Sequence, residues 1–223
     1  MSVLDKSVVS LFAGVGGIEL GLSRAGFSIG LANEIDPFAC KTYRLNFDHA
    51  LIERDVSLLE ESELPESVGV ITGGFPCQPF SVAGHRKGFD DDRGNVFWEI
   101  DRLIRAKNPE VVLLENVKNL VGHDGGKTFS TIIRALTEAG YSVRYEVLNS
   151  STHGNVPQNR ERIYILAFKS AEIAQRFEFP RPIPLTSTLA DFIDFDGEVD
   201  PKYFYTRKTP FFDDLLRAVV RQD

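Results

Sequence analysis

The chain has 223 residues, of which 43% are hydrophobic and 26% charged, and its formal net charge is −7. This size and composition predict one soluble α/β domain, alone or with an appendage, and the apolar runs are too short for a transmembrane helix. Two cysteines and no Cys/His cluster exclude a disulfide framework and argue against structural zinc; without a secretory signal, we expect a cytoplasmic protein.

The first elements have the layout of a nucleotide-type cofactor site. Residues 7–13 predict a strand, Gly14-Val15-Gly16-Gly17 a tight turn, and residues 18–26 a helix that stops at a glycine. Glycine lets the backbone approach a ligand, and the helix start offers free N–H groups. The spacing differs from the dinucleotide pattern GxGxxG, so a plain turn between strand and helix stays open as an alternative.

The next two predicted strands end in acidic residues. Residues 28–34 end at Glu34, about 20 residues beyond the glycine turn, where an acid can accept hydrogen bonds from ribose hydroxyls. A helix is expected at 38–46. Residues 50–55 end at Asp55, which can accept a hydrogen bond from an adenine amino group. For both acids, the alternative is a capping or solvated charge.

The apolar run 68–72 predicts a strand that leads into a loop around Cys77, with a proline on each side of Cys77-Gln78. Prolines fix φ and disfavour helix before them, so the thiol is expected on a stiff loop beyond the strand. Ligands bind at this edge of open α/β sheets, and we predict that Cys77 is a nucleophile. Residues 82–94 follow as a charged surface loop, either a lid or simply solvated.

The remaining apolar segments alternate between helical and strand periods. They predict helices at 95–107 and 127–139, and strands at 110–117, 141–149 and 163–168. The run 110–117 suits a central parallel strand and brings Glu115 to the same rim as Gly14, Glu34 and Cys77. No helix-length segment separates the last two strands, so we expect them to pair antiparallel.

From about Lys169 the sequence changes character. A proline-rich connector is expected at 180–185, a short apolar piece at 189–195, a small strand at 202–205 and a terminal helix at 211–220. This tail is too short to build a second core of its own.

A thiol, an acid and the arginines Arg160 and Arg162 are candidates for one covalent site. Arginine can lower a thiol pKa, a carboxylic acid can protonate a ring nitrogen, and arginine can stabilise charge on an exocyclic oxygen. A Cys/His hydrolase is the alternative, and it requires a distant histidine to reach the thiol.

Four motifs, in this order, resemble those of the DNA (cytosine-5) methyltransferases. Residues 12–17 are similar to the cofactor methionine loop, 74–81 to the catalytic motif, 115–117 to the acid motif and 158–162 to the arginine motif. The resemblance covers residues 8 to 168. It implies an α/β, Rossmann-like S-adenosylmethionine-dependent methyltransferase fold, with a mostly parallel seven-stranded sheet, an antiparallel last strand and helices on both faces. It divides the chain into a catalytic domain, 1–168, and a connector with the incomplete start of a small domain, 169–223.

The resemblance also implies a mechanism. A cytosine is flipped out of duplex DNA, and the Cys77 thiolate attacks its carbon 6. Glu115 holds or protonates nitrogen 3, and carbon 5 takes the methyl group of S-adenosylmethionine, which leaves as S-adenosylhomocysteine. A base then removes the carbon 5 proton and elimination frees Cys77. Arg162 would hold the cytosine O2, and Arg160 would support the pocket.

The resemblance assigns further contacts, and it implies no metal. The cofactor is expected at Phe12, Ala13, Gly14, Gly16, Gly17, Glu34, Ile35, Asp55, Val56, Pro76, Asn95 and Val96. The DNA is expected at Gln78, Ser81, Gly84, Arg86, Lys87, Asn116 and Gln158. Cys40 lies mid-helix and is expected to pack in the core.

The chain departs from the family where it ends. The family carries a target-recognition domain and two further motifs after the arginine motif, so we expect either a truncated chain or one subunit completed by a complementing polypeptide. The negative net charge fits both cases, because the surface that binds DNA phosphates would lie in the part that this chain lacks.

The leading hypothesis is the catalytic portion of a bacterial restriction–modification methyltransferase that acts on double-stranded DNA at the nucleoid, without membrane contact. A module that only binds a cofactor or a partner subunit is the first alternative. A tRNA cytosine methyltransferase is the second.

Overall fold

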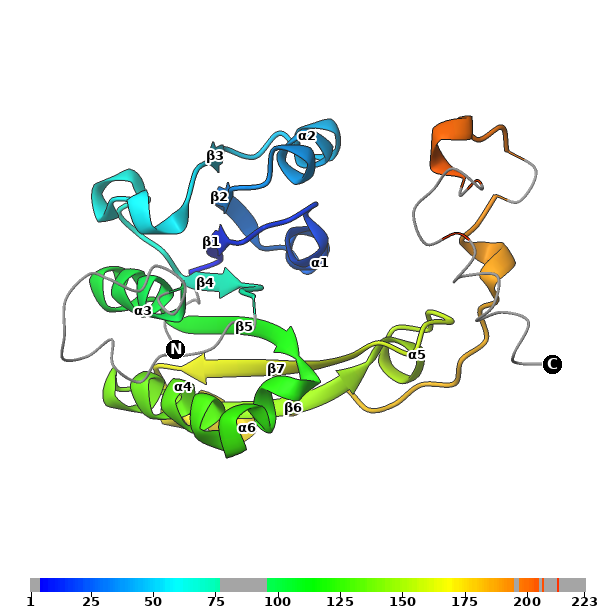
Figure 1. The fold of residues 1–223 in the computed structure, drawn as a ribbon. Coiled ribbons are helices and arrows are strands. Elements are labelled where there is room, and N and C mark those ends of the chain that lie inside the picture. Colours follow the sequence, from blue (N-terminus) through cyan, green and yellow to red (C-terminus); the bar gives the residue numbers. More distant parts are fainter. Residues whose placement is uncertain (1–4, 77–95, 195–196, 205, 207–211, 213–223) are drawn as a thin grey trace. The chain divides into compact units, whose positions relative to one another are not determined.

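Figure 1 shows a computed structural model of the chain, which describes residues 5–76, 96–194, 197–204, 206 and 212. The chain divides into two compact units, Met1–Leu185 and Thr186–Asp223. The strands and the candidate site described below belong to the first unit.

The first unit is built on a seven-stranded sheet. Across the sheet the strands are β3 (Leu51–Glu53), β2 (Ser28–Glu34), β1 (Ser7–Leu11), β4 (Val70–Gly73), β5 (Val111–Val117), β7 (Glu161–Phe168) and β6 (Ser142–Asn149). Neighbours from β3 to β5 are parallel, and β7 is antiparallel to both β5 and β6. The predicted mostly parallel sheet with an antiparallel last strand is confirmed. The chain reverses its direction of progress across the sheet between β1 and β4, where open α/β sheets form their binding crevice.

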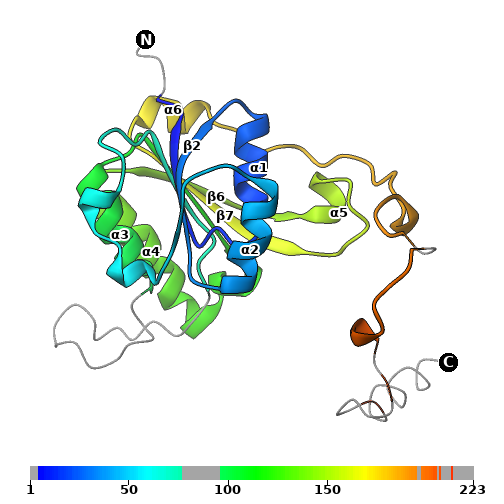
Figure 2. The ribbon, with the colours of Figure 1, turned by 90° about the horizontal axis from the view of Figure 1, so that it is seen from above.

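Helices cover both faces of the sheet, as predicted. Seen from above, α1 and α2 lie on one face and α3 and α4 on the other (Figure 2). The helices are α1 (Gly17–Arg24), α2 (Pro37–Asn46), α3 (Val96–Lys107), α4 (Lys127–Glu138), α5 (Ser150–His153) and α6 (Ala171–Arg176). Short 3-10 turns connect them, including Val56–Leu58, Glu61–Glu63, Lys118–Val121 and His123–Gly126.

Local sequence explains where α2 begins and which face α4 buries. Asp36 caps α2, because its Oδ1 accepts hydrogen bonds from the N–H groups of Phe38 and Ala39 at 2.8 Å, and Pro37 starts the helix with a φ already suited to it. In α4 the buried positions repeat at helical spacing, and this stripe packs into the core on the side where α4 contacts α3 and β6. Its members are Thr128, Phe129, Ile132, Ala135 and Leu136.

The predicted strands and helices of the first unit are all present, with ends shifted by up to two residues. The prediction of a strand at 202–205 is wrong, because Pro201–Tyr203 forms a 3-10 turn in which Tyr203 N–H donates to Asp200 O at 3.0 Å. Helix α6 was not predicted; Ser170 caps it by accepting from Ile173 N–H at 3.3 Å. The helix predicted at 211–220 lies outside the described residues except for residue 212. Within the described part of the chain, no helix is long and apolar enough to cross a membrane.

Candidate active site

The turn after β1 has a backbone that few residue types adopt. Phe12, Gly14 and Gly16 have φ of +56°, +58° and +98°, in the left-handed region, which is strained for a phenylalanine. A Cβ on Gly16 would lie 2.0 Å from the Phe47 ring, whereas a Cβ on Gly14 or Gly17 would meet no atom within 4 Å. The turn is therefore packed from behind at Gly16 and open to a ligand at Gly14 and Gly17.

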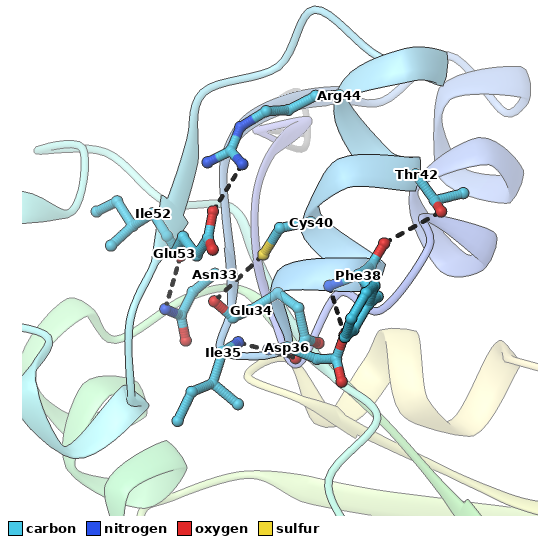
Figure 3. A network of polar contacts seen from close by, with 11 residues as sticks. Asn33, Glu34, Ile35, Asp36, Phe38, Cys40, Thr42, Arg44, Ile52 and Glu53 are labelled. Carbon is cyan, nitrogen blue, oxygen red and sulfur yellow. Dashed lines mark hydrogen bonds and ion pairs between the residues drawn. The ribbon is translucent and has the colours of Figure 1, made fainter.

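The Glu34 carboxylate holds this turn against the end of β2. Gly14 N–H donates to Glu34 Oε2 at 2.8 Å. The N–H groups of Ile35 and Asp36, which Figure 3 labels beside Glu34, donate to Oε1 at 2.8 and 2.9 Å. Ala13 N–H adds a bond to Asn33 O at 3.0 Å. Glu34 is thus oriented toward the glycine turn, and the exposed Ile35 side chain lies next along the chain.

Asn33 is a positioning residue that sequence reasoning missed. Its buried amide donates to the carbonyl oxygen of Ile52 at 3.1 Å (Figure 3) and to that of Arg54 at 2.8 Å, which ties β2 to the end of β3. This tie places Asp55 on the same edge of the sheet as Glu34. The available signal was a polar side chain inside an otherwise apolar strand.

Asp55 caps the turn that follows it, which was the alternative to a contact with the adenine amino group. Its Oδ1 accepts hydrogen bonds from Ser57 N–H at 2.8 Å and Ser57 Oγ–H at 2.7 Å, at the start of Val56–Leu58. The side chain of Val56 is buried in the core, so only its backbone can contact a ligand. Cys40 is buried in α2, as predicted; its thiol donates to Glu34 O at 3.7 Å, and burial raises the pKa of the Cys40 thiol (Figure 3).

The ends of β1, β4 and β5 lie side by side. Leu11 pairs with Gly73, and Gly73 with Leu114, so the next residues of all three strands are neighbours. A Cβ built on Gly74 would lie 3.5 Å from Glu115 Oε2. The acid therefore lies beside the segment that leads from β4 toward Cys77.

Asn116 anchors that segment. Its Nδ2 donates to the Phe75 carbonyl oxygen at 2.8 Å, and its Oδ1 accepts from Val117 N–H at 2.8 Å. The anchor fixes the chain two residues before Cys77, and Pro76 is exposed. The candidate residues Cys77, Gln78, Ser81, Gly84, Arg86, Lys87 and Asn95 lie outside the described residues. Val96 is described: it opens α3 and packs against the core.

The antiparallel pairing of β5 and β7 brings Arg162 to Glu115. Arg162 Nε lies 3.0 Å from Glu115 Oε1, and each side chain is about one-fifth exposed. Arg162 and the exposed Arg160 both line a hollow of about 240 Å³, together with Tyr164. Burial, and then the charge of Glu115, raises the pKa of Tyr164. Gln158 is exposed nearby in sequence, and its N–H is bonded to Val156 O.

The structure groups the described candidates into two neighbouring sets. The first is the glycine turn with Glu34, and Asp55 lies farther along the same sheet edge; the second is Glu115 with Arg162 beside Gly74. Among the described residues, no group of three or more His, Cys, Asp or Glu could hold a metal ion.

Comparison with known proteins decides the family. The family of C-5 cytosine-specific DNA methylases matches residues 6–215. This chain belongs to that family. It is 49% identical over 219 residues to the Type II methyltransferase M.Bsp6I of Bacillus sp. (strain RFL6), covering 97% of this chain and 69% of the relative. It is 40% identical to M.HhaI of Haemophilus parahaemolyticus, covering 86% of this chain and 58% of the relative.

Solved structures support the same assignment. A Spodoptera frugiperda DNMT2 mutant superposes with a TM-score of 0.68 at 27% identity, covering 88% of this chain and 61% of that one. The methylase family member described here therefore has the predicted Rossmann-like methyltransferase fold. It spans between about a third and about two-thirds of the length of the curated relatives it matches.

Proposed function

We propose that this chain is the catalytic portion of a DNA cytosine-5 methyltransferase of a restriction–modification system. The observation that carries the proposal is the ion pair between Glu115 and Arg162 at 3.0 Å. This pair lies next to the segment that leads to Cys77, on the same edge of the sheet as the glycine turn. An acid, an arginine and a cofactor turn around one loop suit activation of a cytosine ring.

The turn fits S-adenosylmethionine, which supplies an electrophilic methyl group on its sulfonium sulfur. Gly14 and Gly17 leave open space where a side chain would block a ligand. Three backbone N–H groups fill three of the roughly four acceptor positions of the Glu34 carboxylate, leaving one for a ribose hydroxyl. Ile35 offers an exposed apolar surface, and the cap on Asp55 uses Oδ1, which leaves Oδ2 for an adenine amino group.

The chain's own residues would carry the covalent steps. The Cys77 thiolate forms a bond to carbon 6 of a flipped cytosine, while Glu115 delivers a proton to nitrogen 3 and makes carbon 5 nucleophilic. Arg162 holds the cytosine O2 with guanidinium N–H groups other than the Nε that pairs with Glu115. After methyl transfer to carbon 5, loss of the carbon 5 proton to a base expels the thiolate, and the nitrogen 3 proton returns to the Glu115 carboxylate, which restores the aromatic ring.

Double-stranded DNA is the proposed partner, with a further segment or subunit supplying target recognition. The matched part leaves about a third of M.Bsp6I, and more of M.HhaI, without a counterpart here. The net charge of −7 fits this proposal, since a DNA-binding face is normally basic and a further segment or subunit would add phosphate-binding surface.

Trapping with 5-fluorocytosine tests the proposal, because fluorine at carbon 5 blocks the final elimination. The chain is incubated with S-adenosylmethionine and a mixed-sequence duplex containing 5-fluorocytosine, alone and with the remaining segment of M.Bsp6I supplied in trans. We expect an adduct that is resistant to denaturant, lost in Cys77→Ser and kept in the matched control Cys40→Ala.

The same trap distinguishes the alternatives. Binding of S-adenosylhomocysteine without any adduct, alone or complemented, would replace the catalytic proposal by a cofactor-binding module. An adduct on a 5-fluorocytosine-containing tRNA transcript but not on the duplex would replace DNA as the substrate.

A further inference from the structure

Glu19 is a buried acid that the proposed chemistry does not use. It lies in the first turn of α1, and its exposed fraction is 0%. Its Oε1 is hydrogen-bonded to the Ser10 hydroxyl, and its Oε2 has no partner among the described residues. Ser10 precedes the glycine turn and Glu19 follows it, so this bond joins the two ends of the turn across its base.

The environment of Glu19 favours the neutral acid. A buried carboxylate with no paired cation among the described residues is disfavoured, so burial raises the pKa of Glu19, and the negative charge of Glu34 raises it further. The hydrogen bonds from the Ser10 hydroxyl and from the backbone of Glu19 itself oppose this rise in pKa only in part. The two carboxyl groups that flank the turn therefore have different environments. Glu34 accepts hydrogen bonds from three backbone N–H groups, whereas Glu19 has no solvent-exposed surface.

Helix α2 connects the Glu19 region to the back of the turn. Tyr43 is fully buried there; burial raises its pKa, an ionised Glu19 would raise it further, and its hydroxyl is hydrogen-bonded to His49 Nδ1 at 2.9 Å. The Tyr43 ring lies 4.8 Å from that of Phe47, which blocks the Cβ position of Gly16. Among the described residues, Glu34 on β2 and Tyr43 on α2 are the ionisable groups that interact with Glu19, and His49 is hydrogen-bonded to Tyr43.

We propose that Glu19 is a positioning residue of the cofactor turn, acting as a neutral acid that bridges to Ser10 and keeps the Gly14 N–H directed at Glu34. An ionised Glu19 would place a second negative charge behind the turn and loosen it. The inference rests on the proposed function only for the identity of the ligand, because the bridge itself is a property of the protein without cofactor.

Hydrogen exchange of the intact chain tests the bridge directly. We compare wild type with Glu19→Ala, with the neutral isostere Glu19→Gln, and with Glu138→Gln, an exposed acid at the end of α4, as the matched control. Loss of one buried hydrogen bond corresponds to exchange about fivefold to tenfold faster. We expect this increase in residues 12–20 of Glu19→Ala alone, with α4 unchanged and Glu19→Gln close to wild type.

A pH series separates positioning from packing. The 13C carboxyl signal of Glu19 should titrate above the ordinary value of 4.5. Protection of the turn in wild type, relative to Glu19→Gln at each pH, should fall as pH rises through that titration. The affinity for S-adenosylhomocysteine should weaken about tenfold in Glu19→Ala and stay within about twofold in Glu19→Gln.

Three results would overturn the inference: titration of Glu19 at or below 4.5, uniform acceleration of exchange across the chain in Glu19→Ala, or unchanged exchange in the turn. If wild type itself bound no S-adenosylhomocysteine, the proposed cofactor would be refuted, and the exchange and titration data would still decide the role of Glu19.

Discussion

Replacing Gly16 by alanine tests whether the Phe47 ring packs against the glycine turn and holds its backbone in place. The new Cβ would lie 2.0 Å from Phe47 Cε2 and 2.7 Å from Cζ, at a φ of +98°. The Phe47 ring cannot move aside freely, because it stacks on His49 with centroids 5.1 Å apart and contacts the Tyr43 ring at 4.8 Å.

Two costs add at Gly16. The left-handed backbone costs a residue with a Cβ about 1–2 kcal/mol. Overpacking against a constrained ring costs about 1–3 kcal/mol more, so the free energy of unfolding should fall by about 2–5 kcal/mol. Gly14→Ala, at φ +58° with open space around the Cβ, should show only the first cost. The difference between the two variants isolates the contact with Phe47.

Urea denaturation measures these free energies, with Gly140→Ala as a matched control at φ +90°, outside the turn and with no atom near its Cβ. In a Phe47→Ala background, Gly16→Ala should cost no more than Gly14→Ala, because the ring is gone. Equal losses for Gly16→Ala and Gly14→Ala in the wild-type background would refute the reasoning.

Three further substitutions have defined outcomes. Asn116→Ala leaves the Phe75 carbonyl without its 2.8 Å donor and should lower the free energy of unfolding by about 1–3 kcal/mol, measured in urea. Glu115→Gln should slow methyl transfer about 10²–10⁴-fold in single-turnover assays with unchanged S-adenosylhomocysteine binding; an unchanged rate would contradict its role as the acid. Burial raises the pKa of Tyr141 from 10.0 to about 12, so wild-type stability should fall as pH rises through this window, and Tyr141→Phe should lack that part of the fall.

Local signals in the sequence were sufficient to predict most strands of the sheet. Strand β2 was predicted with its observed bounds, because an apolar run ends at Glu34 and Asp36-Pro37 starts the next helix. The strand predicted at 202–205 in the tail was wrong for a physical reason. Tyr203 and Phe204 have side chains typical of strands, but strand propensity is realised only against a partner strand, and bonds to Asp200 and Pro201 form a local turn instead.

The order of the motifs was enough to predict which residues belong to the candidate site. It could not predict contacts and burial that depend on how the strands and helices pack. The pairing of Glu115 with Arg162 follows from the antiparallel register of β5 and β7, whereas the sequence predicted antiparallel pairing only between β6 and β7. Glu19 gave no signal, since an acid near the start of a helix is usually a solvated residue that favours the helix dipole. Its burial is a consequence of α1 and α2 packing on the same face of the sheet.

Glu34 and Glu115 differ in the groups that hold them, and this difference suggests which part of the site is rigid and which can rearrange. Glu34 is fixed by three backbone N–H groups that belong to the fold, so it can hold a ligand without moving. The described contact of Glu115 is with one arginine side chain, in a position about one-fifth exposed, and a side-chain pair of this kind can rearrange around an incoming base. Under the proposed function, Glu115 would exchange a proton with cytosine while the hydrogen bond from Asn116 to Phe75 keeps the segment before Cys77 in place. A rigid cofactor side and an adjustable base side are what a reaction between a bound methyl donor and a flipped nucleotide requires.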